Sequence, residues 1–288
     1  MDDGTDPTLE DGLRVLPRGY RPLFDRARAV FERDQRVRAM WVHGAMARHA
    51  IDAASDLDLS IAIADDEFEA FATSWQVWLA LITETVSVVA IAPGSFYALT
   101  PTCERLDVIS ERVSALPHSS LHRRLVVFDR DGLTANLPQP TDPGPDRGLI
   151  RYCIEEAVRQ AANFPTVLVR EDWLLGVVAV QQVHQFLYSL FVEDNKPQPP
   201  TGPKQWSFKL SERHRRLLEA LPVPQPERAS VLEARQAALS ALFQEAPLIA
   251  ARNGVEYPHV LVDAVQSFLE EQGLGLGDPI GPRTAGEQ

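Results

Sequence analysis

Hydrophobic residues follow two different patterns along the chain. Before residue 131 the apolar runs are short and rich in Val and Ile, which is typical of β-strands. Between these runs, apolar residues at helical spacing over 22–36 and 66–81 predict amphipathic helices. The predicted strands cover residues 37–42, 57–64, 85–92, 105–110 and 125–128.

Helical spacing dominates the second half of the chain. Residues 131–147 are rich in Pro and Gly, which predicts a linker between the halves. We therefore predict an α+β fold, with a small mixed-sheet domain over 1–130 and an α-helical bundle domain over 148–272. Residues 273–288 are predicted to form a disordered tail. The predicted helices cover residues 148–163, 171–193, 210–221, 227–244 and 257–272.

The composition narrows the classes of function. Apolar residues make up 45% of the chain and charged residues 24%, which excludes wholesale disorder. Forty Asp and Glu residues against 28 Lys and Arg residues give a formal net charge of −12. Because phosphate contacts need a basic face, this balance argues against nucleic acid as the main partner. It fits either the handling of cationic small molecules or simple solubility.

The number of cysteines and the length of the apolar runs indicate the cellular compartment of the protein. The two cysteines, Cys103 and Cys153, are far apart in the sequence, so a disulfide scaffold and a multi-cysteine zinc site are excluded. We find no apolar stretch of membrane-spanning length and no signal peptide at the acidic N-terminus. The sequence therefore predicts a cytoplasmic protein without a membrane partner.

Two acids open the second predicted strand. Asp56 and Asp58 are two residues apart, and side chains at that spacing share one face of a strand. Two such carboxylates repel each other unless a cation lies between them. Mg²⁺ is a suitable cation, because it prefers a few carboxylate ligands completed by water and phosphate oxygens.

A third acid, Asp107, stands alone between apolar neighbours in a later predicted strand. Burying the carboxylate of Asp107 is costly unless it has a partner. If a neighbouring strand carries Asp56 and Asp58, a metal ion bound by all three acids would be that partner. Three such carboxylates suit nucleotidyl transfer, in which metal ions neutralise charge on a triphosphate. The alternative interpretation is a solvated edge of the sheet.

The turn before these acids also fits a phosphate site. Gly44 ends the first predicted strand, and glycine lets the backbone approach a ligand closely. A short helix follows the turn, so its first amides would face an anion.

These residues resemble the nucleotidyltransferase superfamily, the β-polymerase-like fold that includes antibiotic adenylyltransferases. The resemblance covers residues 37–110, about a quarter of the chain. One departure is Ala45, which stands where the family usually has Ser, so the amide is kept and the hydroxyl is lost. The matching residues are Val42-Gly44-Ala45, Ala47-Arg48, Asp56-Leu57-Asp58-Leu59 and Leu106-Asp107-Val108.

The resemblance implies a cofactor, a co-substrate and roles for particular residues. It implies Mg²⁺ bound by Asp56, Asp58 and Asp107, which are also the catalytic residues. It implies ATP, or another nucleoside triphosphate, whose monophosphate passes to a hydroxyl of a small molecule such as an aminoglycoside or a lincosamide. The residues predicted to bind the nucleotide are Gly44, Ala45, Arg48 and Lys204.

The helical half is similar in layout to the substrate-binding part of antibiotic nucleotidyltransferases. Acids there contact the amines of the antibiotic in that family, and a helix face in solvent or a helix N-terminus explains such acids equally well. We take the acids Glu155, Glu171 and Asp172 as candidates for substrate binding, and Trp206 as a candidate stacking surface for the substrate.

Several alternatives stay open at this point. The acceptor of the transfer could be a protein or a tRNA, for which Arg213, Arg215 and Arg216 are the local basic candidates. The chain could also be a nucleotide-binding relative without activity. The sequence does not decide whether Asp107 or Glu171 is the general base, and it leaves the oligomeric state unknown.

Overall fold

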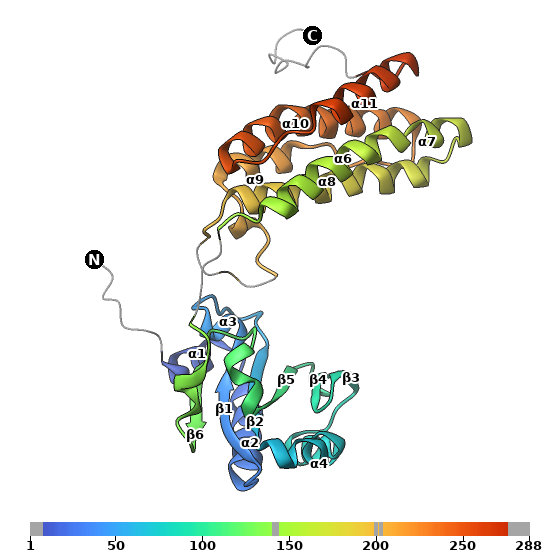
Figure 1. Ribbon diagram of the computed structural model, residues 1–288. Helices are drawn as coiled ribbons and strands as arrows, with labels where there is room; N and C mark the ends of the chain where they lie inside the picture. Colours follow the sequence, from blue (N-terminus) through green and yellow to red (C-terminus); the bar gives the residue numbers. More distant parts are fainter. Residues whose placement is uncertain (1–7, 140–143, 199–200, 202–203, 276–288) are drawn as a thin grey trace. The chain divides into compact units, whose positions relative to one another are not determined.

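The computed structural model describes residues 8–139, 144–198, 201 and 204–275, which belong to two compact units (Figure 1). The first unit contains Met1–Thr141 and Pro200–Gln205, and the second contains Asp142–Pro199 and Trp206–Gln288. A mixed sheet with helices forms the first unit and helices form the second, so the predicted α+β class is confirmed.

The sheet of the first unit has six strands in the order β3-β4-β5-β2-β1-β6. All neighbours are antiparallel except β2 and β5, which are parallel. The five predicted strands are present, and β4 was missed because it is a short hairpin partner joined to β3 by Pro93 and Gly94. The bounds are Val37–Val42 for β1, Leu57–Ile63 for β2, Ser87–Ala92 for β3, Ser95–Leu99 for β4, Arg105–Arg112 for β5 and Leu125–Asp129 for β6.

Helices cover the apolar face of this sheet. Leu57, Leu59 and Ile61 of β2 are completely buried against that layer. The single helix predicted over 66–81 is broken at Ser74, whose hydroxyl donates to the carbonyl of Phe71 at 2.9 Å. The α-helices of the unit are α1 Leu9–Val15, α2 Tyr20–Arg33, α3 Gly44–Ala47, α4 Phe68–Thr73 and α5 Trp75–Ile82. The 3₁₀ turns are η1 Asp65–Glu67, η2 Val113–His118 and η3 Leu133–Asn136.

Part of the predicted linker packs within the first unit. Leu133 and Leu137 are buried against Trp41 on the second face of the sheet, and the indole of Trp41 donates to Thr134 at 2.9 Å. The prediction missed this packing because the prolines around these leucines indicated only an irregular chain. Residues 140–143 of the linker lie outside the described residues.

The second unit is a bundle whose core is formed by α6, α8 and α10 with α11. All five predicted helices are present. One of them, α10, continues nine residues beyond its predicted end because Ile249 and Ala250 remain in the core after Pro247. The helices are α6 Arg147–Asn163, α7 Pro165–Arg170, α8 Trp173–Asp194, α9 Glu212–Ala220, α10 Arg228–Asn253 and α11 His259–Glu271, with the 3₁₀ turn η4 Ser207–Lys209.

Two sequence expectations need correction in this unit. Leu274, placed in the predicted tail, is buried, and its carbonyl accepts a hydrogen bond from Arg235; residues 276–288 of that tail lie outside the described part. We found no apolar stretch of membrane-spanning length, but α8 is 22 residues long and contains an 18-residue window with a mean hydropathy of 1.3. A third of that window is buried, and α8 contributes Leu187 and Phe191 to the bundle core.

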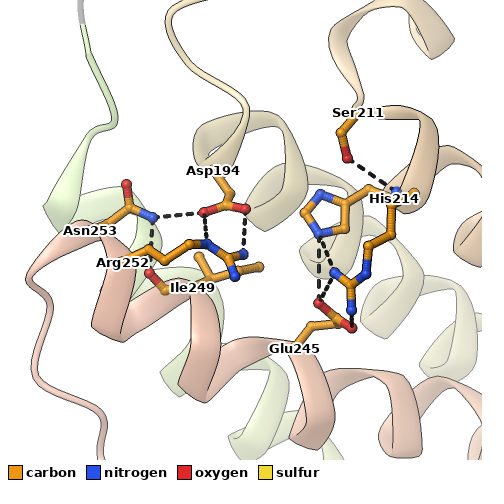
Figure 2. Close-up of polar contacts among 8 residues, drawn as sticks. Asp194, Ser211, His214, Glu245, Ile249, Arg252 and Asn253 are labelled. Atoms are coloured by element: carbon orange, nitrogen blue, oxygen red, sulfur yellow. Dashed lines mark hydrogen bonds and ion pairs between the residues drawn. The ribbon is translucent and has the colours of Figure 1, made fainter.

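Buried polar groups join the helices at one end of the bundle (Figure 2). Glu245 of α10 accepts hydrogen bonds from Arg213 and lies beside His214, whose ring stacks on Phe191 at 4.0 Å. Asp194 at the end of α8 is paired with Arg252 of α10 at 2.7 Å. These contacts tie the end of α8 and the start of α9 to α10.

Candidate active site

A glycine turn brings the backbone against a carboxylate. After β1, Gly44 begins α3 with φ +66°, a conformation that favours glycine. A Cβ atom at Gly44 would lie 1.7 Å from Oδ2 of Asp58, so the side chain of Asp58 occupies the space that a larger residue needs. The amide of Ala45 donates a hydrogen bond to the same carboxylate.

Replacing Gly44 by Ala should therefore disturb the site more than the fold. We expect the Gly44→Ala protein to lose about 1 to 2 kcal/mol of unfolding free energy because of the positive φ and the contact with Asp58. The nucleotidyl transfer proposed below should fall by about 30-fold, since Asp58 must move. Urea unfolding and steady-state assays measure the two effects. The exchange Gly132→Ala, also at positive φ but with open space around its Cβ, is the control. Equal loss of activity in both variants would contradict this account.

The register of the sheet brings the three predicted carboxylates together. Asp58 of β2 and Asp107 of β5 are direct partners in the parallel pair, and Asp56 lies two residues before Asp58. All three line a pocket of about 500 Å³ in the first unit, together with Gly44, Ala45, Arg48 and Lys204. The residues predicted for catalysis and for nucleotide binding thus share one cavity, and their roles remain predictions.

The acids of this pocket repel one another. Burial raises the pKa of Asp107 to about 7, and the charges of Asp58 and Asp56 add to this effect. Burial and the charge of Asp56 also raise the pKa of Asp58. At neutral pH, Asp107 is therefore a carboxyl group that can accept a proton.

Two cations pair with Asp56. The ammonium of Lys204 lies 2.8 Å from Oδ2, and the guanidinium of Arg105 lies 3.3 Å from Oδ1. Lys204 is 148 residues further along the chain and returns to the first unit in the segment Pro200–Gln205. Lys204 thus offsets part of the negative charge of Asp56, and its contact with phosphate stays a prediction.

The donor set fits Mg²⁺, although the carboxylates are not arranged around an ion. Among the described residues, no three His, Cys, Asp or Glu side chains stand in a metal-binding group. The oxygen donors of Asp56, Asp58 and Asp107 are nevertheless the kind that Mg²⁺ prefers. Their mutual repulsion, seen in the raised pKa of Asp58 and Asp107, is the cost that a divalent cation would remove. Metal binding by this trio stays a prediction.

Arg48 and His43 complete the wall beside the turn. Arg48 is half-buried, and its Nε atom has no hydrogen-bond partner within the described part of the chain. Burial lowers the pKa of Arg48, while the charge of Asp58 opposes this effect. His43 is buried next to Arg124, and burial lowers its pKa to about 4, so it is neutral. The buried Nε atom of Arg48 is thus an unpaired donor beside the acids, within the described part of the chain.

Two acidic substrate candidates of the second unit, Glu155 and Asp172, have local structural partners. Glu155 pairs with Arg151 at 2.7 Å, and Asp172 caps α8 by accepting from the amide of Leu175 at 3.0 Å. Glu171 lies at the end of α7 with φ 51°. These contacts agree with the structural explanation of the acids, and a role in substrate binding or as general base stays a prediction for them.

Trp206 lies in a different environment. Its ring stacks on Tyr188 at a centroid distance of 4.2 Å and lines a pocket of about 340 Å³ within the second unit. About half of the side chain is exposed. Its predicted contact with substrate remains open.

The basic segment near α9 is neutralised by its own neighbours. Arg213 binds Glu245, and both Arg215 and Arg216 bind Glu212. These pairs leave little positive charge for a nucleic acid, so they disfavour the tRNA alternative.

Sequence reasoning did not single out Arg105, which pairs with Asp56, or Tyr97, which lines the carboxylate pocket. Arg105 stands two positions before Asp107 on the same strand, so the spacing alone could have placed it on that face. Tyr97 lines the pocket from β4, the strand that was not predicted. Tyr97 lies between the buried residues Phe96 and Ala98, and this alternation identifies its face only once β4 is known to be a strand.

Comparisons with known proteins find structural likeness only. No family model and no curated protein matches the chain. Among solved structures, the chain is similar to an aminoglycoside 6-adenyltransferase from Bacillus subtilis, with 14% identity, a TM-score of 0.41, and coverage of 88% of this chain and 96% of that one. It is also similar to a nucleotidyltransferase-like protein from Exiguobacterium sibiricum, with 13% identity, a TM-score of 0.36, and coverage of 86% and 91%.

A third similar structure is a cyclic dinucleotide synthase from Elizabethkingia meningoseptica, with 12% identity, a TM-score of 0.30, and coverage of 93% of this chain and 94% of that one. Two of the three are named as an adenyltransferase or a nucleotidyltransferase-like protein. At these TM-scores the likenesses say nothing of substrate or mechanism, which depend on the residues of the site.

Proposed function

We propose that this protein is a Mg²⁺-dependent nucleotidyltransferase that transfers AMP from ATP to a hydroxyl of a small molecule. One observation carries the proposal: Asp58 and Asp107 are paired on adjacent parallel strands, with Asp56 on the same face and the Gly44 turn beside them. Two repelling acids that are partly buried serve no packing purpose, and they suit a site that receives positive charge.

Each residue of the pocket has a role in this proposal. Asp56, Asp58 and Asp107 would hold Mg²⁺, which supplies neutralisation of the triphosphate charge. Arg48 and Lys204 bind phosphate oxygens, and the backbone at Gly44 and Ala45 lies close to the triphosphate. Because Ala45 has no hydroxyl, the phosphate contact at this position comes from the backbone alone.

The reaction needs one proton acceptor. The hydroxyl oxygen of the acceptor forms a bond to the α-phosphorus as the bond to the leaving pyrophosphate breaks. We assign the hydroxyl proton to Asp107, which lies between Asp58 and Tyr97 in the register of the sheet and lines the same pocket.

The direct test follows the α-phosphate. The full chain is incubated with Mg²⁺, α-labelled ATP and a panel of aminoglycosides and lincosamides, and both pyrophosphate and labelled acceptor are measured. Label on a small molecule with equal release of pyrophosphate supports the proposal. Binding of Mg-ATP without transfer to any acceptor would indicate the inactive relative, and label on a co-expressed protein or tRNA would indicate the macromolecular alternative.

Removing the distant lysine tests the assignment of the phosphate site. We expect Lys204→Gln to raise the KM for ATP by about 10-fold, because one charged contact with phosphate is worth about 1.4 kcal/mol. The KM for the acceptor should change less than twofold. The control is Arg28→Gln, which removes one exposed cation from α2, where it pairs with Glu32. An unchanged KM for ATP in Lys204→Gln would show that this lysine serves only as the partner of Asp56.

A further inference from the structure

The carboxylates belong to a row of side chains that crosses four strands. In the register of the sheet, Asp58 pairs with Asp107, Asp107 pairs with Tyr97, and Tyr97 pairs with Val89. Residues paired in this way project from the same face of a sheet. Neighbouring strands are about 4.8 Å apart, so Tyr97 lies next to Asp107 and Val89 lies about 10 Å from it.

The far part of this row is apolar and exposed. Tyr97 is 48% exposed and Val89 is 56% exposed, although their neighbours on the opposite face, such as Ala98, are buried in the core. We call Val89 and Tyr97 the apolar strip. It lies on the β3 side of the acids, whereas Gly44 lies on the β1 side. The pocket therefore has a phosphate side and an apolar side, with the carboxylates between them.

The apolar side also lacks charge. Neither Ser87–Ala92 of β3 nor Ser95–Leu99 of β4 contains an acidic or basic residue. Ile109 and Leu121, which line the pocket with Tyr97, are apolar as well. A polycation needs a carboxylate near each ammonium group, and β3 and β4 offer none; the acids of the pocket, Asp52 included, lie on other elements.

We propose that the acceptor is an amphiphilic hydroxyl compound whose aromatic or aliphatic face lies on Tyr97 and Val89, rather than a polycation. This inference rests on the proposed function and names its substrate class. The acceptor hydroxyl lies at Asp107, which takes its proton as the oxygen bonds to the α-phosphorus and pyrophosphate leaves. The part of the acceptor next to that hydroxyl covers the apolar strip, and aromatic rings such as Tyr97 are well suited to such a contact.

The experiment compares two probes on the full chain with Mg²⁺. Lincomycin serves as the amphiphilic alcohol and kanamycin as the polycation. Saturation-transfer NMR in the presence of a non-hydrolysable ATP analogue measures binding, and release of pyrophosphate from ATP measures turnover. We expect lincomycin to bind and to accept AMP with a KM at least 10-fold below that of kanamycin.

Variants of the strip then test the residues themselves. Tyr97→Ala and Val89→Lys should each raise the KM for lincomycin by at least 5-fold, with the KM for ATP unchanged within twofold, and Tyr97→Phe should restore the wild-type KM. Both side chains are exposed, so the fold should tolerate the changes. Val126→Lys, an exposed apolar position on the opposite edge strand β6, is the control and should leave both constants unchanged.

The two proposals fail in different ways. Transfer of AMP to kanamycin with a KM that Tyr97→Ala does not change would overturn the strip and leave nucleotidyl transfer standing. Binding of lincomycin that depends on Tyr97, without any transfer, would overturn the reaction and leave the strip standing. If neither lincomycin nor kanamycin binds while Mg-ATP does, the proposed acceptor class is wrong.

Discussion

Asp58→Asn is expected to lower the kcat of nucleotidyl transfer by at least about 1,000-fold, because the site loses a charge aimed at the reacting phosphates. Asp58 is more deeply buried than Asp107, and the two are direct partners in the sheet. The amide isostere keeps the volume and can still accept from the amide of Ala45. We therefore expect wild-type circular dichroism and a melting temperature at least as high as that of the wild type, because a repelling charge has been removed.

The measurement needs a control in which the same exchange removes another negative charge from the pocket. Asp52→Asn changes an acid that lines the same pocket but stands in the loop before β2, where its side chain holds the turn at Ala54 and Ser55. That variant should keep activity within about threefold. If Asp58→Asn retained more than a tenth of the wild-type kcat, the assignment of Asp58 to the reacting centre would be wrong, whatever the reaction.

The acids could be predicted from the sequence because their signal is local. A period of two places Asp56 and Asp58 on one face, and an acid between Leu106 and Val108 is unusual in a strand. The proximity of Asp107 to Asp58 was inferred only from the cost of burying an isolated carboxylate. The structure shows the two residues as direct partners in the parallel pair of β2 and β5.

Other parts of the site depend on contacts that leave no local trace. Tyr97 belongs to a five-residue strand that is identified by its pairing with β3 and β5 rather than by its own pattern. The return of residues 200–205 to the first unit places Lys204 at Asp56, and no periodicity in the sequence marks such a return. Lys204 was predicted through the resemblance to antibiotic nucleotidyltransferases.

A pH-dependent gain of stability is expected from Asp107→Asn in protein freed of divalent ions. The pKa of Asp107 is raised to about 7 in the folded state, above its ordinary value of 3.8, so the folded protein binds the extra proton between these values. Its stability therefore falls as the pH rises from about 4 to about 7, and this cost is fully present above pH 7. Because Asn carries no charge, the variant should escape this loss.

We expect the unfolding free energy of Asp107→Asn to exceed that of the wild type by about 1 to 2 kcal/mol at pH 8. This is less than the full free-energy equivalent of the pKa shift, because solvent screens the partly exposed carboxylate. At pH 5 the difference should be smaller. Urea unfolding in EDTA at both pH values measures it, and Asp66→Asn, at an exposed position of η1, is the control. Addition of Mg²⁺ at pH 8 should stabilise the wild type and leave Asp107→Asn almost unchanged, because the cation relieves the same repulsion that the substitution removes. Metal binding at Asp107 would be refuted if Mg²⁺ did not raise the unfolding free energy of the wild type at pH 8. That result would hold even if Asp107→Asn were more stable than the wild type at pH 8, as the electrostatic cost of Asp107 alone predicts.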